Sequence, residues 1–364
     1  MRGCVRLSVV LAAATLTLAG CGGDDDEAEP AGESGAGAST GESADISGTT
    51  MTFVSWGGTY QDAQEQTMTT PFAEARGVEF LQDGPTDYAK IKTQVEAGQV
   101  TWDVIDMDPY FAIQQCNKLL VPIDTSVVDT SKMPPELVSE CAVPSMVYST
   151  ANYYNADKFG DGPPTDWADF FDTEKFPGKR AVFNDSQGGA LEAALMADGV
   201  AEEDLYPIDY DRAFAKLDTI KDDLIFWDEG AQAQQMIETG EADMVMAWLG
   251  RGYTAIKNGA NYEPVWNGAQ GVYDVFTVPK GSKNEAAAME FISYATGAEA
   301  QTGLAEALPY APINSDADPQ VDELLASFLP TKPEISEQMV TIDQDWWAAN
   351  KDEADQLWTS WTGG

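Results

Sequence analysis

The sequence contains no histidine, and this absence restricts its chemistry more than any other feature of its composition. Without histidine the chain can form neither a Ser-His-Asp nor a Cys-His catalytic centre, and no metal site with a histidine ligand. An enzyme built on this sequence would have to use carboxylates, lysines or tyrosines. We expect neither a bound metal ion nor a cofactor.

Basic residues are scarce: 20 Lys and Arg face 61 Asp and Glu, a formal net charge of −41. Nucleic acids and anionic membrane surfaces need a basic footprint, so we exclude both as direct partners. A cationic ligand remains compatible with the charge, and so does an acidic surface that serves only solubility. The length of 364 residues is sufficient for two domains of ordinary size.

Long apolar runs are absent apart from the N-terminus, where Arg2 and Arg6 precede an apolar segment at residues 7–18. This segment is too short to span a bilayer as a stable helix and is typical of an export signal. It ends in Leu-Ala-Gly-Cys, which resembles the lipobox of bacterial lipoproteins. The resemblance implies a signal peptide at residues 1–20 and lipidation of Cys21, with the protein anchored on the outer face of the cytoplasmic membrane.

Cysteines are few, and the exported chain would retain only two besides the lipidated one, Cys116 and Cys141. Two cysteines in an oxidising compartment pair by default, so we predict a disulfide between them. Closing this loop stabilises the chain by about 3.5 kcal/mol in the chain-entropy model.

Residues 21–49 are rich in Gly, Ala, Ser, Asp and Glu, a composition that predicts a disordered tether. Beyond it, strands and helices alternate. The first predicted elements are strands at 50–55, 78–81 and 102–107 and helices at 59–75 and 87–97. The first of these helices is expected to break at Pro71. The tail at 318–361 is predicted to be helical. This β-α-β-α-β order predicts a parallel, doubly wound α/β sheet.

One stretch, residues 242–252, has the pattern of a ligand-facing turn. Met244 to Ala247 is a short apolar run typical of a buried parallel strand, and Trp248 and Arg251 follow where the next helix begins. Ligands of open α/β sheets bind beyond the carboxyl ends of the strands. The alternative is that Trp248 fills the core and Arg251 is a surface charge.

Read in order, the chain resembles the extracellular solute-binding proteins of ABC importers, and more narrowly the spermidine/putrescine-binding group. Six short stretches carry the resemblance: Ser-Trp-Gly-Gly-Thr-Tyr-Gln-Asp-Ala-Gln from residue 55, Trp-Asp-Val-Ile-Asp from 102, Lys-Phe-Pro-Gly-Lys-Arg from 175, Met-Ala-Trp-Leu-Gly-Arg from 246, Val-Pro-Lys-Gly from 278 and Pro-Tyr-Ala-Pro-Ile-Asn from 309. It implies a two-lobed, type II-like periplasmic-binding-protein fold whose lobes, joined by crossing strands, close on a ligand. The expected lobes are residues 50–147 plus 272–315 and residues 148–271 plus 316–364.

The resemblance also implies ligand-binding residues. Trp56 and Trp248 match the family's aromatic positions, Asp274 its carboxylate, and Tyr310 its tyrosine. An ammonium group gains about 0.5–2 kcal/mol over each aromatic face and needs a carboxylate when it is buried. The full candidate set adds positions in or near the same turns and strand ends: Tyr60, Asp108, Asp185 and Arg251.

Two departures from the group leave the ligand open. Only Asp185 remains in a turn where the polyamine group carries several acidic residues, and Arg251 would repel a polyamine or pair with a ligand carboxylate. A cationic amine such as spermidine or putrescine is our first expectation. An opine, an amino-acid derivative or a sugar is the alternative.

The expected partners are this ligand and a membrane permease, and we expect a monomer. A secreted glycoside hydrolase is the rival reading, because such enzymes use paired carboxylates without histidine. Asp106 with Asp108, or Glu241 with Asp243, would supply the pair. A purely structural surface lipoprotein is a further alternative.

Overall fold

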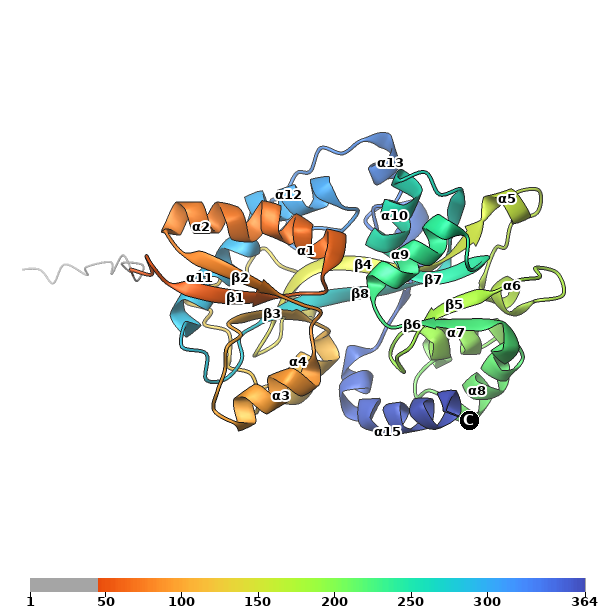
Figure 1. Cartoon of the computed structure of the whole chain (residues 1–364), viewed down its shortest axis with the longest axis horizontal. Helices are drawn as coiled ribbons and strands as arrows, with labels where there is room; N and C mark the ends of the chain where they lie inside the picture. The colour runs from red at the N-terminus through yellow and green to blue at the C-terminus, as the bar shows by residue number, and fades with distance from the viewer. Residues whose placement is uncertain (1–44, 364) are drawn as a thin grey trace, which may run out of the picture. The chain divides into compact units, whose positions relative to one another are not determined.

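The computed structural model describes residues 45–363 and shows a nine-stranded β-sheet with helices on both faces (Figure 1). The strands are β1 (Thr50–Val54), β2 (Glu79–Asp83), β3 (Val104–Met107), β4 (Val143–Asn155), β5 (Arg180–Phe183), β6 (Leu224–Trp227), β7 (Met244–Trp248), β8 (Tyr262–Thr277) and β9 (Val340–Thr341). Their order across the sheet is β2-β1-β3-β8-β4-β7-β5-β6, and β9 pairs with β8.

The sheet consists of two parallel groups joined by two long strands. β1 pairs in parallel with β2 and β3, and β5 pairs in parallel with β6 and β7. Between these groups β4 and β8 run antiparallel to one another, β8 also pairing with β3 and β4 with β7. The predicted α/β fold, with two parallel groups connected by crossing strands, is confirmed.

The helices cover both faces of each group, as Figure 1 shows. Over β1–β3, α1 and α2 lie on one side and α3 and α4 on the other. Over β5–β7, α9 and α10 lie on one side and α7, α8 and α15 on the other. The helices are α1 (Gly58–Gln64), α2 (Thr70–Arg76), α3 (Tyr88–Glu96), α4 (Pro109–Gln115), α5 (Ala156–Phe159), α6 (Trp167–Phe171), α7 (Ala190–Ala197), α8 (Tyr210–Asp218), α9 (Gly230–Thr239), α10 (Leu249–Lys257), α11 (Glu285–Ala295), α12 (Ala298–Ala307), α13 (Glu323–Ala326), α14 (Pro333–Ser336) and α15 (Gln344–Thr362).

Two hydrophobic cores lie on opposite faces of the sheet, and β7 contributes to both. Val245 and Ala247 pack in one core, Met244 and Met246 in the other, and none of the four is more than 1% exposed. Successive side chains of a strand point to opposite faces, so a strand covered on both sides needs a continuous apolar run. This is why the run that predicted a buried strand is uninterrupted.

Three local expectations differ from the structure. Pro71 does not break a helix: it lies in the first turn of α2, which follows α1 through a π-helical segment at Glu65–Thr69. Proline is tolerated there because a first-turn N–H has no intrahelical partner. The tail is only partly helical, with the two-residue β9 and the long α15. Ile46, which the composition assigns to the tether, is buried in the core.

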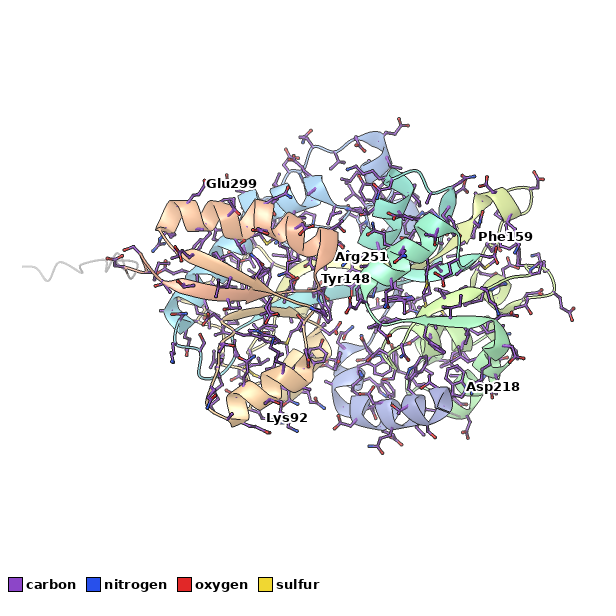
Figure 2. All side chains as sticks on the ribbon, in the orientation of Figure 1. Lys92, Tyr148, Phe159, Asp218, Arg251 and Glu299 are labelled. Carbon is purple, nitrogen blue, oxygen red and sulfur yellow. A yellow bond between two sulfur atoms is a disulfide. The ribbon has the colours of Figure 1, made fainter. Side chains whose placement is uncertain are left out.

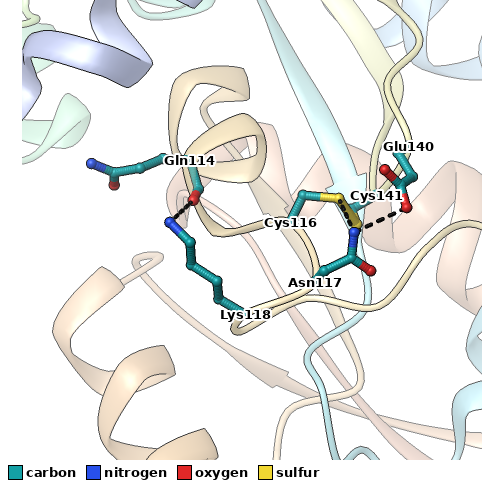
Figure 3. The surroundings of a disulfide bond; sticks show 6 residues. All are labelled: Gln114, Cys116, Asn117, Lys118, Glu140 and Cys141. Carbon is teal, nitrogen blue, oxygen red and sulfur yellow. Dashed lines mark hydrogen bonds between the residues drawn. A yellow bond between two sulfur atoms is a disulfide. The ribbon is translucent and has the colours of Figure 1, made fainter.

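The predicted disulfide between Cys116 and Cys141 is present (Figure 3). It joins the end of α4 to the segment entering β4. Beside it, Asn117 adopts a left-handed conformation (φ 62°), and its side-chain amide donates to Glu140 at 2.9 Å. The bridge therefore ties down an irregular loop. Cys21, the signal segment and the tether up to residue 44 lie outside the described residues.

Candidate ligand-binding site

A cavity of about 460 Å³ lies where the two parallel groups of strands face each other. This volume is in the range of small-molecule binding sites. All eight residues predicted from the sequence line it: Trp56, Tyr60, Asp108, Asp185, Trp248, Arg251, Asp274 and Tyr310.

The fold explains why residues so distant in sequence meet here. Trp56, Asp108 and Asp185 follow the carboxyl ends of β1, β3 and β5, and Trp248 ends β7. The carboxyl ends of parallel strands meet at one edge of a sheet, and the two groups present these edges to the same cavity. Asp274 lies on the crossing strand β8, so it reaches the cavity between the groups.

Trp248 packs against the core, as one of the two alternatives from the sequence has it, and it also lines the cavity. Its ring packs edge-to-face on Trp227, with centroids 5.1 Å apart, and on Phe183 at 5.3 Å. The same ring meets Trp56 of the other group at 6.0 Å. Trp248 therefore packs in one half of the fold and also forms the aromatic contact between the halves.

Tyr60, one of the tyrosines that line the cavity, is held by a hydrogen bond to the buried carboxyl group of Asp106. The Tyr60 hydroxyl donates to Asp106 at 2.6 Å, and Gln64 and Ser145 donate to the same carboxyl at 2.6 and 2.8 Å. Burial raises the pKa of Asp106 to about 6, and these hydrogen bonds oppose the rise. Asp106 is fully buried and orients Tyr60, whose ring packs against Tyr310 at 5.1 Å.

Asp274 is an acid of the cavity that is almost fully buried and whose pKa is raised. Its side chain is 2% exposed, and Oδ1 has no hydrogen-bond partner among residues 45–363. Burial raises its pKa well above the ordinary range, and the charges of Asp106 and Asp108 raise it further. A buried carboxyl oxygen without a partner is costly, so this atom is a ready acceptor for a ligand donor.

Arg251 is buried rather than a surface charge, with 3% of its surface exposed (Figure 2). The guanidinium donates to the carbonyl oxygen of Gly57 at 2.9 Å and to the Thr59 hydroxyl at 3.2 Å, and it forms no ion pair within the described part of the chain. A Cβ atom at Gly58 or Gly230 would lie 2.6 Å from it, so glycine at both positions permits the approach. Burial lowers the pKa of Arg251 from its usual value.

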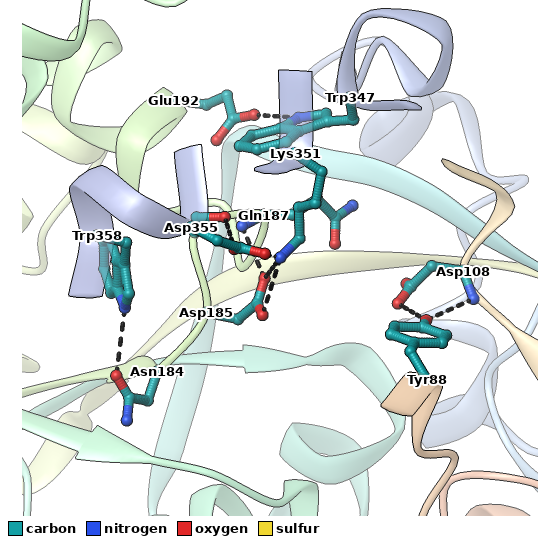
Figure 4. A network of polar contacts seen from close by, with 11 residues as sticks. Tyr88, Asp108, Asn184, Asp185, Gln187, Glu192, Trp347, Lys351, Asp355 and Trp358 are labelled. Carbon is teal, nitrogen blue, oxygen red and sulfur yellow. Dashed lines mark hydrogen bonds and ion pairs between the residues drawn. The ribbon is translucent and has the colours of Figure 1, made fainter. Parts of the chain in front are cut away.

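Sequence reasoning missed three acids of the lining, Asp87, Asp228 and Glu229. It also missed Lys351 of α15, which lies beside the cavity (Figure 4). Its ammonium lies 3.3 Å from the Asp185 carboxylate and also forms an ion pair with Asp355. Nearby, the Tyr88 hydroxyl donates to Asp108, whose pKa burial raises to about 6. Asp185 thus faces the cavity as predicted, but its charge is already paired.

Several uncharged lining residues were also missed, among them Tyr148 of β4, Tyr88 and Tyr110. In the sequence, polar and apolar residues alternate at 147–154, which is typical of a strand and is the one local signal that bears on Tyr148. Asp243, by contrast, forms an ion pair with Lys158 at 2.9 Å and does not line the cavity.

Residues 67–327 match the family described as bacterial extracellular solute-binding protein. The chain belongs to this family. Among curated relatives, the gamma-aminobutyric acid-binding protein of Pseudomonas aeruginosa is 33% identical over 319 residues, covering 85% of this chain and 90% of the relative. The spermidine/putrescine-binding periplasmic protein 1 of Haemophilus influenzae is 24% identical over 251 residues, covering 66% and 68%.

Solved structures give the same assignment. A GABA receptor is 44% identical with a TM-score of 0.79, covering 86% of this chain and 97% of that one. The periplasmic binding protein AgtB of A. tumefaciens R10, in complex with agropinic acid, is 38% identical with a TM-score of 0.81, covering 87% and 99%. The two-lobed periplasmic-binding-protein fold is confirmed.

The predicted membership of the ABC-importer solute-binding proteins is also confirmed, and the glycoside hydrolase reading is wrong, because these relatives are substrate-binding proteins of transporters. The family is extracellular or periplasmic. Within residues 45–363, no helix is both long and apolar enough to cross a bilayer.

Proposed function

We propose that this solute-binding protein captures a small molecule carrying one ammonium and one carboxylate group, such as an ω-amino acid or an opine, and delivers it to an ABC permease. One observation carries the proposal. The same cavity presents an unpaired carboxyl oxygen of Asp274 and a buried guanidinium of Arg251 that has no carboxylate partner within residues 45–363.

The ammonium end fits Asp274. In the free protein burial and the neighbouring carboxylates disfavour its charged form, and a ligand cation would reverse this balance. Trp56 and Tyr148 line the cavity with it, so a desolvated ammonium would also meet aromatic faces.

The carboxylate end fits Arg251. A guanidinium binds a carboxylate through two parallel hydrogen bonds, which are stronger than its present bonds to a backbone carbonyl and a hydroxyl. Helix α10 begins at Leu249, directly after Trp248 of the lining, and its N-terminus favours an anion, whereas the N-terminus of α9 is already capped by the Glu229 side chain.

The relatives support this ligand class. Two of them are named for gamma-aminobutyric acid, and one holds agropinic acid. A polyamine is the second candidate, favoured by the spermidine/putrescine-binding relative and by the six acidic residues that line the cavity: Asp87, Asp108, Asp185, Asp228, Glu229 and Asp274. The pairing of Asp185 with Lys351 weakens it, because this carboxylate is then not free to bind a second ligand ammonium.

Ligand capture would proceed by closure of the two lobes, with residues 50–147 plus 272–315 moving against the remainder about β4 and β8. The protein would act as a monomer held at the membrane by lipidated Cys21. Replacing Cys21 with Ser should release it from membranes while leaving its fold intact, which fractionation after a salt wash would test. A variant that remains membrane-bound would contradict the lipid anchor.

A thermal-shift series tests the ligand class. We expect 4-aminobutanoate to stabilise the mature protein, and butylamine, butanoate and glucose at equal concentration to stabilise it far less. A ligand at a hundred times its dissociation constant adds about 2.7 kcal/mol to the free energy of unfolding. Stabilisation by spermidine or 1,4-diaminobutane, with none by 4-aminobutanoate or agropinic acid, would favour the polyamine instead.

A further inference from the structure

We propose that Lys351 is a fixed internal cation that makes this site select ligands with one ammonium group over diamines. The inference rests on the proposed function, because it concerns how the amine-binding cavity discriminates among amines.

Lys351 is buried and fixed in position, unlike a lysine on the surface. The residue is 6% exposed, and its ammonium pairs with Asp185 at 3.3 Å and with Asp355 one helical turn further along α15. Figure 4 shows Lys351 between Asp185 and Asp355, and the Ser186 hydroxyl donates to Asp355 at 2.6 Å, which fixes the second carboxylate. The positive charge is therefore anchored from two sides.

The Lys351 ammonium also contacts α4, a helix that covers the other parallel group of strands, β1–β3. It lies 5.6 Å from the ring centroid of Tyr110 on α4, within the range of a cation–π contact. Tyr110, Asp108 and Asp185 all line the cavity, whereas Lys351 stands behind them. The Lys351 ammonium therefore lies next to the lining acids Asp108 and Asp185 but outside the cavity.

This placement affects a diamine and an amino acid differently. A diamine with one ammonium at Asp274 must place the second beside another carboxylate or leave it unpaired in a desolvated site. Of the other lining acids, which include Asp87, Asp228 and Glu229, Asp108 and Asp185 are the two that experience the charge of Lys351, and Lys351 already pairs with Asp185. The charge of Lys351 would also repel the second ammonium of a diamine near Asp108 and Asp185. A ligand whose single ammonium binds Asp274 places no positive charge there.

Titration calorimetry at neutral pH with the full mature protein tests the inference. The probes are 4-aminobutanoate and 1,4-diaminobutane, and the measured quantity is the ratio of their affinities. We expect Lys351→Met to shift this ratio toward the diamine by at least about tenfold, since like charges a few ångströms apart repel strongly. Lys351→Arg, which keeps the charge, should retain the wild-type ratio.

Two further variants separate charge from packing. Lys351→Met combined with Asp185→Asn removes the cation and the carboxylate together, so the diamine should gain nothing. Lys92→Met, on the exposed face of α3, makes the same charge change away from the cavity and should retain the wild-type ratio. Circular dichroism checks that each variant folds, and Lys351→Gln replaces Lys351→Met if the latter does not.

An unchanged ratio in a folded Lys351→Met or Lys351→Gln variant would overturn the inference, as would an equal gain in the double variant. Failure of the proposed function is a separate result. In that case the wild-type protein binds no ligand that combines an amine with a carboxylate, while the diamine titrations still report on Lys351.

Discussion

Replacing Asp274 with Asn is the most informative single change to the cavity. The two side chains have almost the same shape, so the variant removes the charge and leaves the packing of this 2% exposed residue in place. A ligand ammonium would then face an amide in a desolvated pocket. Losing one partner of a buried charge pair costs about 2–5 kcal/mol, a loss of affinity of about thirtyfold to several thousandfold.

The structure places the expected loss in the lower part of this range. The pKa of Asp274 is held well above its usual value by burial and by the charges of Asp106 and Asp108. Binding of an ammonium must therefore ionise Asp274, and this ionisation offsets part of the favourable binding free energy. We therefore expect the affinity for 4-aminobutanoate to fall by about thirty- to three-hundredfold. The ligand-free variant should also unfold at a higher temperature than wild type at neutral pH, because an amide, unlike the Asp274 carboxylate, need not take up a proton to be buried.

Titration calorimetry and thermal unfolding measure both effects. Asp222→Asn, an exposed acid outside the cavity lining, is the matched control and should change neither. If Asp274→Asn binds 4-aminobutanoate as well as wild type, the assignment of the ammonium end is wrong. A neutral ligand such as a sugar would then be the better account.

Three further predictions concern other parts of the molecule. Arg251→Ala should lower 4-aminobutanoate affinity about thirtyfold or more, and leave 1,4-diaminobutane binding unchanged or tighter, in the same calorimetric assay. Replacing Cys116 and Cys141 with Ala should lower the free energy of unfolding by about 3.5 kcal/mol in denaturant titrations, with ligand binding retained. Burial raises the pKa of Asp106 and Asp108 to about 6. Their contribution to the free energy of unfolding should therefore be greatest below about pH 4 and be lost as pH rises through 6. Thermal unfolding measured across this pH range tests this.

Locally encoded features were predictable from the sequence. Asp87 and Asp209 cap α3 and α8 through side-chain hydrogen bonds to backbone N–H groups, and Gly240 ends α9 in the left-handed conformation. Each follows from the preference of one residue type for one backbone position. The site residues at strand ends were predictable because a parallel sheet brings those ends together.

Features that depend on distant partners were not predictable. Lys351 lies 166 positions after Asp185, and nothing near it in the sequence indicates that α15 brings the two together. The first half of β8 carries no clear alternation, because one stretch of it pairs with β4 across a bulge.

A crystal structure of the mature protein with 4-aminobutanoate would test the central claim most directly. Our account predicts one molecule in the cavity between the lobes, with its carboxylate within hydrogen-bonding distance of the Arg251 guanidinium and its ammonium beside Oδ1 of Asp274. A ligand bound in the opposite orientation, or outside this cavity, would contradict the account.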